Sequence, residues 1–237
     1  MDLSVKLKDP GQRTAFTVES IEKWLNAGAD ARLVVCDGSG FDFSEIVRHK
    51  FPGRLIECLS FENNRQLVEV HGKGYGEGEI IRYAMAHSAF LKSTDWFVKC
   101  TGKLWVDNFS ECFKEWNNLF LCKAYFSRVF SFRRTKLEYI DTRFYMVSKD
   151  FYLKYFADAH LKVSGAYGTS IEDNFREIVL RNNLQQVLFR SPPVVCGVGG
   201  GSGTYYKNTK VRRLKEVLRS RIVQSNRSFS ALFNRKT

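Results

Sequence analysis

Apolar residues recur at helical and strand spacings throughout the first hundred residues. Residues 17–27 carry apolar side chains three or four positions apart, which predicts an amphipathic helix, and residues 77–92 repeat the pattern. Short apolar runs predict strands at 32–36, 55–58 and 96–99. Because helices alternate with short strands, we expect an α/β sheet that is at least partly parallel.

The second half of the chain is richer in strand-like runs. They predict strands at 119–134, 139–148 and 186–189, with helices at 108–116, 149–157 and 170–183. A short apolar segment at 194–196 then leads into residues 197–203, which hold five glycines in seven positions. Such a stretch can close over a phosphate or serve as a linker.

The positive charge is concentrated at the C-terminal end. The 237 residues include 37 Lys and Arg against 25 Asp and Glu, a net charge of +12. Residues 205–237 hold ten of the basic residues and one acidic residue, so this segment carries +9 and the remaining 204 residues carry +3. We therefore divide the chain into a domain at 1–205 and a basic tail at 206–237.

The tail combines its charge with a helical apolar pattern. Val211, Leu214, Val217, Leu218 and Ile222 share one side of a helix expected over residues 209–223. A basic amphipathic helix is suited to an anionic membrane surface, although it can also pack on the body with its cationic face in solvent. No apolar run reaches the ~18–20 residues of a membrane span, and the first residues lack a secretory h-region. We expect a cytoplasmic protein, peripheral on the inner face of the membrane.

The cysteines and histidines give no sign of a metal or disulfide framework. The six cysteines are scattered without a CxxC pair, and the four histidines complete no zinc pattern. Most of the cysteines lie in apolar runs, where a free thiol acts as a small hydrophobe. This usage is typical of a reduced compartment.

Three segments could bind an anionic ligand. Asp37-Gly38 ends a strand, where a carboxylate can meet a base or ribose hydroxyl, although Asp-Gly is also a common turn. Residues 72–78 hold four glycines in seven positions before a helix; here Lys73, Gly74 and Glu77 could form an anion site or a flexible helix start. The third segment, at a strand end, contains Lys99, Thr101, Gly102 and Lys103. Its two lysines could clamp a diphosphate or simply be solvated.

Two further groups could carry chemistry. Glu172 and Asp173 begin a helix after Ser170, where one carboxylate could act as a base, although acids there also favour the helix dipole. The segment 125–145 mixes aromatic and basic residues that suit sugar rings and acidic groups, while alternate members suit a core. Its candidate acceptor-binding residues are Arg133, Arg134, Arg143 and Tyr145.

The order of these segments resembles the nucleotide-sugar glycosyltransferases of the GT-A type over roughly residues 14–205. The resemblance implies a single Rossmann-like α/β domain with a mixed, mostly parallel central sheet. It also implies that Asp37 contacts the nucleoside and that Asp173, beside Glu172, is the catalytic base. The donor-binding residues it implies are Asp37, Gly38, Lys73, Gly74, Glu77, Lys99, Thr101, Gly102 and Lys103.

The chain departs from the family at the metal motif. No Asp-x-Asp occurs; the matching position reads Lys99-Cys100-Thr101-Gly102-Lys103, similar to bacterial glycosyltransferases with a KxTG(R/K) sequence. Because lysines repel Mg²⁺ and can themselves stabilise a leaving phosphate, we expect no metal and no other cofactor.

These features predict transfer of a sugar from a nucleotide-sugar donor to a hydroxyl of a glycan or lipid-linked glycan in cell-surface polysaccharide or lipopolysaccharide synthesis. Direct displacement with Asp173 as base gives inversion, and retention stays open. Two alternatives are a basic nucleic-acid-binding protein, in keeping with the pI of about 9.5, and a GT-A-like nucleotidyltransferase. We expect no nucleic-acid partner, because the charge lies in one terminal helix. The nucleotidyltransferase needs a Gly-rich loop after its first strand, and the segment after residues 2–7 has one glycine.

Overall fold

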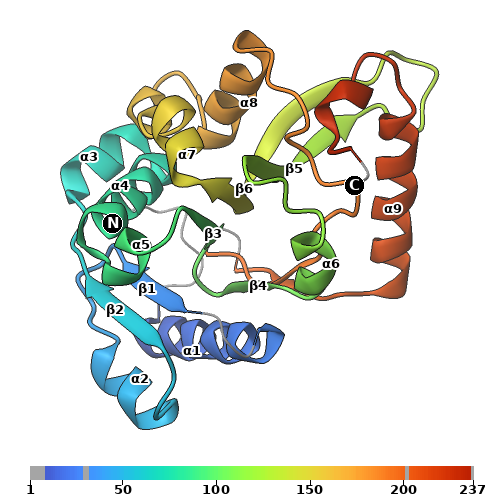
Figure 1. The fold of residues 1–237 in the computed structure, drawn as a ribbon. Helices are drawn as coiled ribbons and strands as arrows, with labels where there is room; N and C mark the ends of the chain where they lie inside the picture. The colour runs from blue at the N-terminus through green and yellow to red at the C-terminus, as the bar shows by residue number, and fades with distance from the viewer. Residues whose placement is uncertain (1–8, 29–31, 201–202, 236–237) are drawn as a thin grey trace.

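The computed structural model describes residues 9–28, 32–200 and 203–235 (Figure 1). Its helices are α1 (Pro10–Ala27), α2 (Ser44–Lys50), α3 (Arg65–His71), α4 (Lys73–His87), α5 (Ala89–Lys92), α6 (Phe109–Phe113), α7 (Lys149–Tyr155), α8 (Ile171–Arg181) and α9 (Lys210–Gln224), with short 3-10 turns at Ala159–Lys162 and Ser230–Leu232. Its strands are β1 (Leu33–Asp37), β2 (Ile56–Ser60), β3 (Trp96–Cys100), β4 (Leu104–Val106), β5 (Phe120–Ser127), β6 (Lys136–Ser148), β7 (Val195–Val198) and β8 (Tyr205–Tyr206). The strand considered at residues 2–7 lies outside the described residues, as do residues 201 and 202 of the glycine stretch.

The strands form three small groups, and most of their pairings are antiparallel. Strands β1 and β2 pair in parallel, whereas β3-β6-β5 and β4-β7-β8 are antiparallel. The mixed α/β class is therefore confirmed, and the mostly parallel central sheet is wrong. The physical reason is the long β6: it follows β5 through a hairpin, which forces an antiparallel pair, and it also runs antiparallel to β3.

Two predicted elements differ in the structure: one expected helix is divided in two, and one expected strand forms only isolated bridges. The helix expected at 77–92 is two helices, because Ser88 leaves the helical conformation and its hydroxyl accepts a hydrogen bond from Leu91 N at 3.0 Å. The strand expected at 186–189 is an extended segment in which Leu188 forms isolated bridges with Cys122 and Phe233. Phe233 thereby joins the tail to the sheet of the body.

The main core lies where β5 and β6 meet α7 and α8. Phe120, Tyr145, Phe156 and Phe175 are at most 2% exposed, and the rings of Phe156 and Phe175 stack with centroids 4.2 Å apart. Val223 of α9 belongs to the same core and is 1% exposed. The C-terminal helix is thus packed on the body, and β8 spans the boundary expected between residues 205 and 206.

Helix α4 is held close to its neighbours by three glycines of its first two turns. A Cβ on Gly74 would lie 2.9 Å from Ile171 Cβ, and one on Gly78 would lie 2.2 Å from His160 Cβ. Gly76 faces Asn63 in the same way, at 3.1 Å. These glycines lie inside the helix, which begins at Lys73 and not at the expected residue 77, so the flexible helix start, one of the two interpretations of this stretch, is wrong. Their physical role is to let α4 approach other elements closely.

Candidate functional site

The candidate residues gather where the carboxyl ends of β1 and β3 face the first turns of α4 and α8. Helix α1 fixes one side of this region: Ser20 Oγ and Trp24 Nε1 donate to Leu104 O at 2.6 and 3.1 Å. These two bonds tie α1 to β4 and place its first turns beside the turn that joins β3 to β4. Arg13, which sequence reasoning missed, enters the site from this helix.

Asp37 and Lys103 belong to one charged group. Burial lowers the pKa of Lys103, the nearby charge of Arg13 lowers it further, and the carboxylate of Asp37 opposes both. Asp37 Oδ1 also accepts a hydrogen bond from Ser39 N at 2.8 Å. Two cations and one acid therefore lie within electrostatic range of one another near the end of β1, and the Lys103 side chain is half-buried there.

The glycine stretch after β7 lies against Lys103. Lys103 O accepts from Val198 N at 3.0 Å, and a Cβ on Gly197 would lie only 2.2 Å from that oxygen. Gly197 and Lys103 both have positive φ, at 100° and 69°. A Cβ on Gly200 would be 3.7 Å from Lys103 Cε. The described part of the stretch is therefore a close backbone neighbour of the lysine side chain, in a position to contact an anion bound there.

Lys99 is buried and has its own partners. It is 9% exposed, and its ammonium donates to Glu77 Oε1 at 2.5 Å, Thr101 Oγ1 at 2.9 Å and Thr142 O at 2.6 Å. These three bonds use all three of its N–H donors. Lys99 and Glu77 are brought together as predicted site residues, but the geometry makes Lys99 a positioning group for the end of β3 rather than a cation facing a phosphate.

Glu172 and Asp173 point to different partners. Glu172 accepts from Thr142 Oγ1 at 3.2 Å, and burial together with the nearby charge of Glu77 raises its pKa. Asp173 forms a capping box with Ser170: its Oδ2 accepts from Ser170 N at 3.2 Å, and its own N–H donates to Ser170 Oγ at 3.1 Å. Glu172 therefore faces the group formed by Glu77, Lys99, Thr101 and Thr142 at the end of β3, which we call the polar cluster. Asp173 instead caps the start of α8.

Arg143 forms an ion pair with the buried carboxylate of Asp141 on β6. Its Nε and Nη2 donate to the two carboxylate oxygens of Asp141 at 2.8 and 2.6 Å, and Asp141 is 5% exposed. This bidentate contact keeps the pKa of Asp141 low despite its burial. Arg143 Cζ also lies 5.3 Å from the ring centroid of Tyr206, and Arg212 Cζ of α9 lies 5.6 Å from the same centroid. Arg143 O accepts from Thr101 N at 2.8 Å, so this pair lies beside the turn after β3.

Several predicted residues lie apart from this region or have structural partners. Tyr145 is 1% exposed within the aromatic core, which contradicts its predicted contact with an acceptor. Arg133 and Arg134 lie in the turn of the β5–β6 hairpin, and the extended strand β6 separates them from Arg143 by roughly 30 Å. The predicted acceptor-binding residues are therefore not brought together. Gly38 packs against Asn63 and Ile80, while Gly102 faces open space.

The residues that sequence reasoning missed are Arg13, Asp141 and Thr142. Asp141 and Arg143 alternate on one strand, and this i, i+2 spacing was a usable signal for a same-face ion pair. No local signal marks Arg13, whose place depends on how α1 packs.

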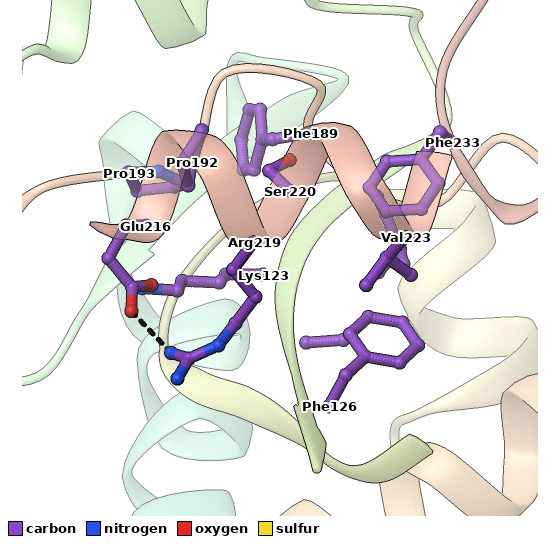
Figure 2. A pocket seen from close by; sticks show the side chains of 12 residues that line it. Lys123, Phe126, Phe189, Pro192, Pro193, Glu216, Arg219, Ser220, Val223 and Phe233 are labelled. Carbon is purple, nitrogen blue, oxygen red and sulfur yellow. Dashed lines mark hydrogen bonds and ion pairs between the residues drawn. The ribbon is translucent and has the colours of Figure 1, made fainter. Parts of the chain in front are cut away.

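Two hollows lie away from the predicted site residues. A groove of about 540 Å³ runs between α4, α5 and α7, lined by Met85, Leu91 and Leu153 among others. None of the predicted site residues lines it. A cavity of about 30 Å³ between β5 and α9 has room for one or two waters (Figure 2).

In the described residues, no three His, Cys, Asp or Glu side chains are grouped so as to hold a metal ion, and metal independence stays a prediction. No helix within the described ranges is long and apolar enough to cross a bilayer. Comparison of the chain with protein-family models, curated proteins and solved structures finds no match. The resemblance to GT-A glycosyltransferases therefore rests on the order of the sequence motifs alone.

Proposed function

We propose that the chain is a GT-A-like glycosyltransferase that binds a nucleotide-sugar donor at the carboxyl end of β1. The observation that carries the proposal is the convergence of Asp37, Lys103 and Arg13 at that strand end. A nucleoside diphosphate needs a hydrogen-bond acceptor for its base or ribose and cations for its phosphates, and these three side chains supply both.

The glycine stretch supports the same assignment. Gly197 and Gly200 bring backbone next to Lys103; a Cβ on Gly197 would collide with the Lys103 carbonyl, whereas one on Gly200 would be in ordinary contact with the Lys103 side chain. The N–H groups of Val198, Gly199 and Gly203 already donate to backbone carbonyls, so the stretch supports the site by allowing this close approach of its backbone to Lys103. Lys73 begins α4, a helix N-terminus in the same region, and belongs to the predicted donor site as well.

The base that we propose is Glu172 rather than Asp173. Glu172 faces the polar cluster and has a raised pKa, which makes its carboxylate a stronger base than an ordinary glutamate, whereas Asp173 is engaged by Ser170. The acceptor hydroxyl gives its proton to the Glu172 carboxylate while its oxygen bonds to the anomeric carbon. The bond from that carbon to the diphosphate breaks, and the diphosphate leaves with the electron pair, stabilised by Lys103 and Arg13.

A single displacement of this kind inverts the anomeric centre, and it requires no metal when fixed cations stabilise the leaving group. Arg143, which is one-third exposed and held by Asp141, is the predicted acceptor residue that stays near the site. Its guanidinium suits an acidic or phosphorylated glycan, including a lipid-linked one. Because a lipid-linked acceptor is held in the membrane, we also propose that the enzyme acts at the cytoplasmic face of the membrane.

A ligand screen tests the proposal. Purified protein is heated with UDP, GDP, CDP, dTDP or CMP, with and without EDTA, and the midpoint of thermal unfolding is measured. We expect one nucleotide to raise the midpoint by several degrees in either condition, and the corresponding nucleotide-sugar to be consumed in the presence of an acceptor glycan. Lys103→Gln should lose the shift, and Lys50→Gln, an exposed lysine on α2, should retain it. No shift with any nucleotide would overturn the donor site.

A further inference from the structure

Helix α9 is turned with its polar side towards the body. Glu216 Oε2 lies 2.5 Å from Lys123 Nζ, and its Oε1 accepts from Arg219 at 2.7 Å (Figure 2). Ser220 Oγ donates to Arg190 O at 3.0 Å. Apart from Val223, the contacts that attach this helix to the body are therefore largely polar.

The opposite side of α9 is apolar and exposed. Val211, Leu214, Leu218 and Ile222 are 66%, 61%, 45% and 44% exposed. Their spacing of three, four and four residues places them in one stripe along the helix. A helix that packs on a globular body normally buries its apolar stripe, so this arrangement is the reverse of the usual one. The stripe is available to a partner outside the chain.

Positive charge borders the stripe on both sides. At about 100° per residue, Lys215 and Arg221 lie roughly 60° to either side of the stripe, and both are exposed. Glu216, the one acidic residue of α9, is on the inward side, paired with Lys123. The outward face is therefore apolar at its centre and cationic at its edges.

The β5–β6 hairpin turn extends the same surface. Residues 128–135 contain three arginines and no acid, and Phe130 and Phe132 there are 61% and 113% exposed. Figure 1 shows this turn beside the C-terminal half of α9. Arg219 of α9 lies 5.8 Å from the ring centroid of Phe130, which joins the two elements directly.

We propose that the outward face of α9 and the hairpin turn 128–135 form one docking surface for an anionic lipid bilayer. Helix α9 lies in the plane of the headgroups with Leu214 and Leu218 inserted, and Phe132 inserts from the hairpin turn. Lys215, Arg221, Arg133 and Arg134 meet the lipid phosphates. This assigns Arg133 and Arg134 to the membrane instead of the acceptor cleft, and it does not depend on the proposed glycosyl transfer.

Vesicle sedimentation of the full chain tests the surface. Vesicles of phosphatidylcholine alone are compared with vesicles in which about one third of the lipid is phosphatidylglycerol. We expect binding to the anionic vesicles and about tenfold weaker binding to the neutral ones. Leu214→Ser with Leu218→Ser should weaken anionic binding about tenfold, and Phe132→Ser or Arg133→Gln with Arg134→Gln should weaken it several-fold.

Matched controls come from apolar residues exposed elsewhere. Val70→Ser on α3 and Leu180→Ser on α8, which remove side chains 64% and 53% exposed, should leave binding unchanged.

The proposal is overturned if wild-type protein does not sediment with anionic vesicles, or if the α9 double variant binds as well as wild type. A dimer in solution that the double variant abolishes, without vesicle binding, would instead assign the stripe to a second copy. Salt-sensitive binding to RNA that survives the double variant, again without vesicle binding, would assign the charge to nucleic acid.

Discussion

Glu172 and Asp173 are consecutive residues whose carboxylates accept different hydrogen bonds: Glu172 accepts from Thr142 Oγ1 at 3.2 Å and Asp173 accepts from Ser170 Oγ at 2.7 Å, while Ser170 also acts to lower the pKa of Glu172. The start of a helix creates this separation, because residues one apart point about 100° away from each other. In α8 the Glu172 side chain points to the polar cluster at the end of β3, and the Asp173 side chain points back to the N-cap residue Ser170. The two carboxylates can therefore be tested separately.

Glu172→Gln should lower the rate of sugar transfer about 100-fold or more, because a neutral amide cannot accept the proton of the acceptor hydroxyl. Asp173→Asn should leave turnover within a few-fold of wild type and lower the free energy of unfolding by about 1 kcal/mol, through the weakened capping box. Steady-state kinetics and urea unfolding measure the two effects. The reverse pattern, with activity lost in Asp173→Asn alone, would return the base to Asp173.

The pH dependence of transfer should carry the signature of Glu172. Burial and the charge of Glu77 raise the pKa of Glu172, so the rate should climb with pH through a value above the usual glutamate range. The raised pKa in the folded state also means that ionised Glu172 costs stability, and this cost grows as pH rises through that pKa. Glu172→Gln should accordingly be more stable than wild type at pH 8 and equal to it at pH 3.5. Equal stabilities at both pH values would contradict the raised pKa.

The ion pair of Lys99 and Glu77 should contribute to stability far more than an exposed pair. Lys99→Met leaves the Glu77 carboxylate without its counter-charge beside Glu172, and we expect the free energy of unfolding to fall by about 3 kcal/mol. Glu77→Gln combined with Lys99→Met should be less destabilised than Lys99→Met alone. Lys136→Met, which breaks the exposed pair with Glu138, is the matched control and should change little. A Lys99→Met protein as stable as wild type would show that the pair is screened by solvent.

What could be predicted from the sequence depends on how far apart the interacting residues lie. Asp37 at a strand end and Ser170 at a helix start are local signals, and the structure has both. Lys99 was taken for a phosphate cation because two of its three partners, Glu77 and Thr142, are 22 and 43 residues away, and no local pattern connects them. The antiparallel β3–β6 pair is equally non-local, which is why the sheet direction was predicted wrongly.

Helix α9 shows the same limit in another form. Helical periodicity grouped Val211, Leu214, Val217, Leu218 and Ile222 on one side, since this depends only on spacing; in the structure Val217 is half-buried and the other four form the exposed stripe. It could not show which way that face points, because the direction is decided by Lys123 and Arg190, which lie on other parts of the chain. The interpretation of the tail as a helix packed on the body is confirmed, and its apolar stripe nevertheless stays exposed. The interpretation of the tail as a membrane-binding helix stays a prediction.

The glycines of α4 allow a last prediction that separates packing from ligand binding. Gly78→Ala would gain about 1 kcal/mol of helix propensity, but its Cβ would lie 2.2 Å from His160, which is 1% exposed and cannot move aside. Overpacking of this kind costs more than the gain, so the free energy of unfolding should fall by about 2 kcal/mol. Gly11→Ala in α1, where the nearest atom is 3.4 Å away, should be neutral or stabilising. If these glycines served an anion instead, Gly78→Ala would weaken nucleotide binding with unchanged stability. Thermal unfolding with and without the nucleotide measures both quantities in one experiment.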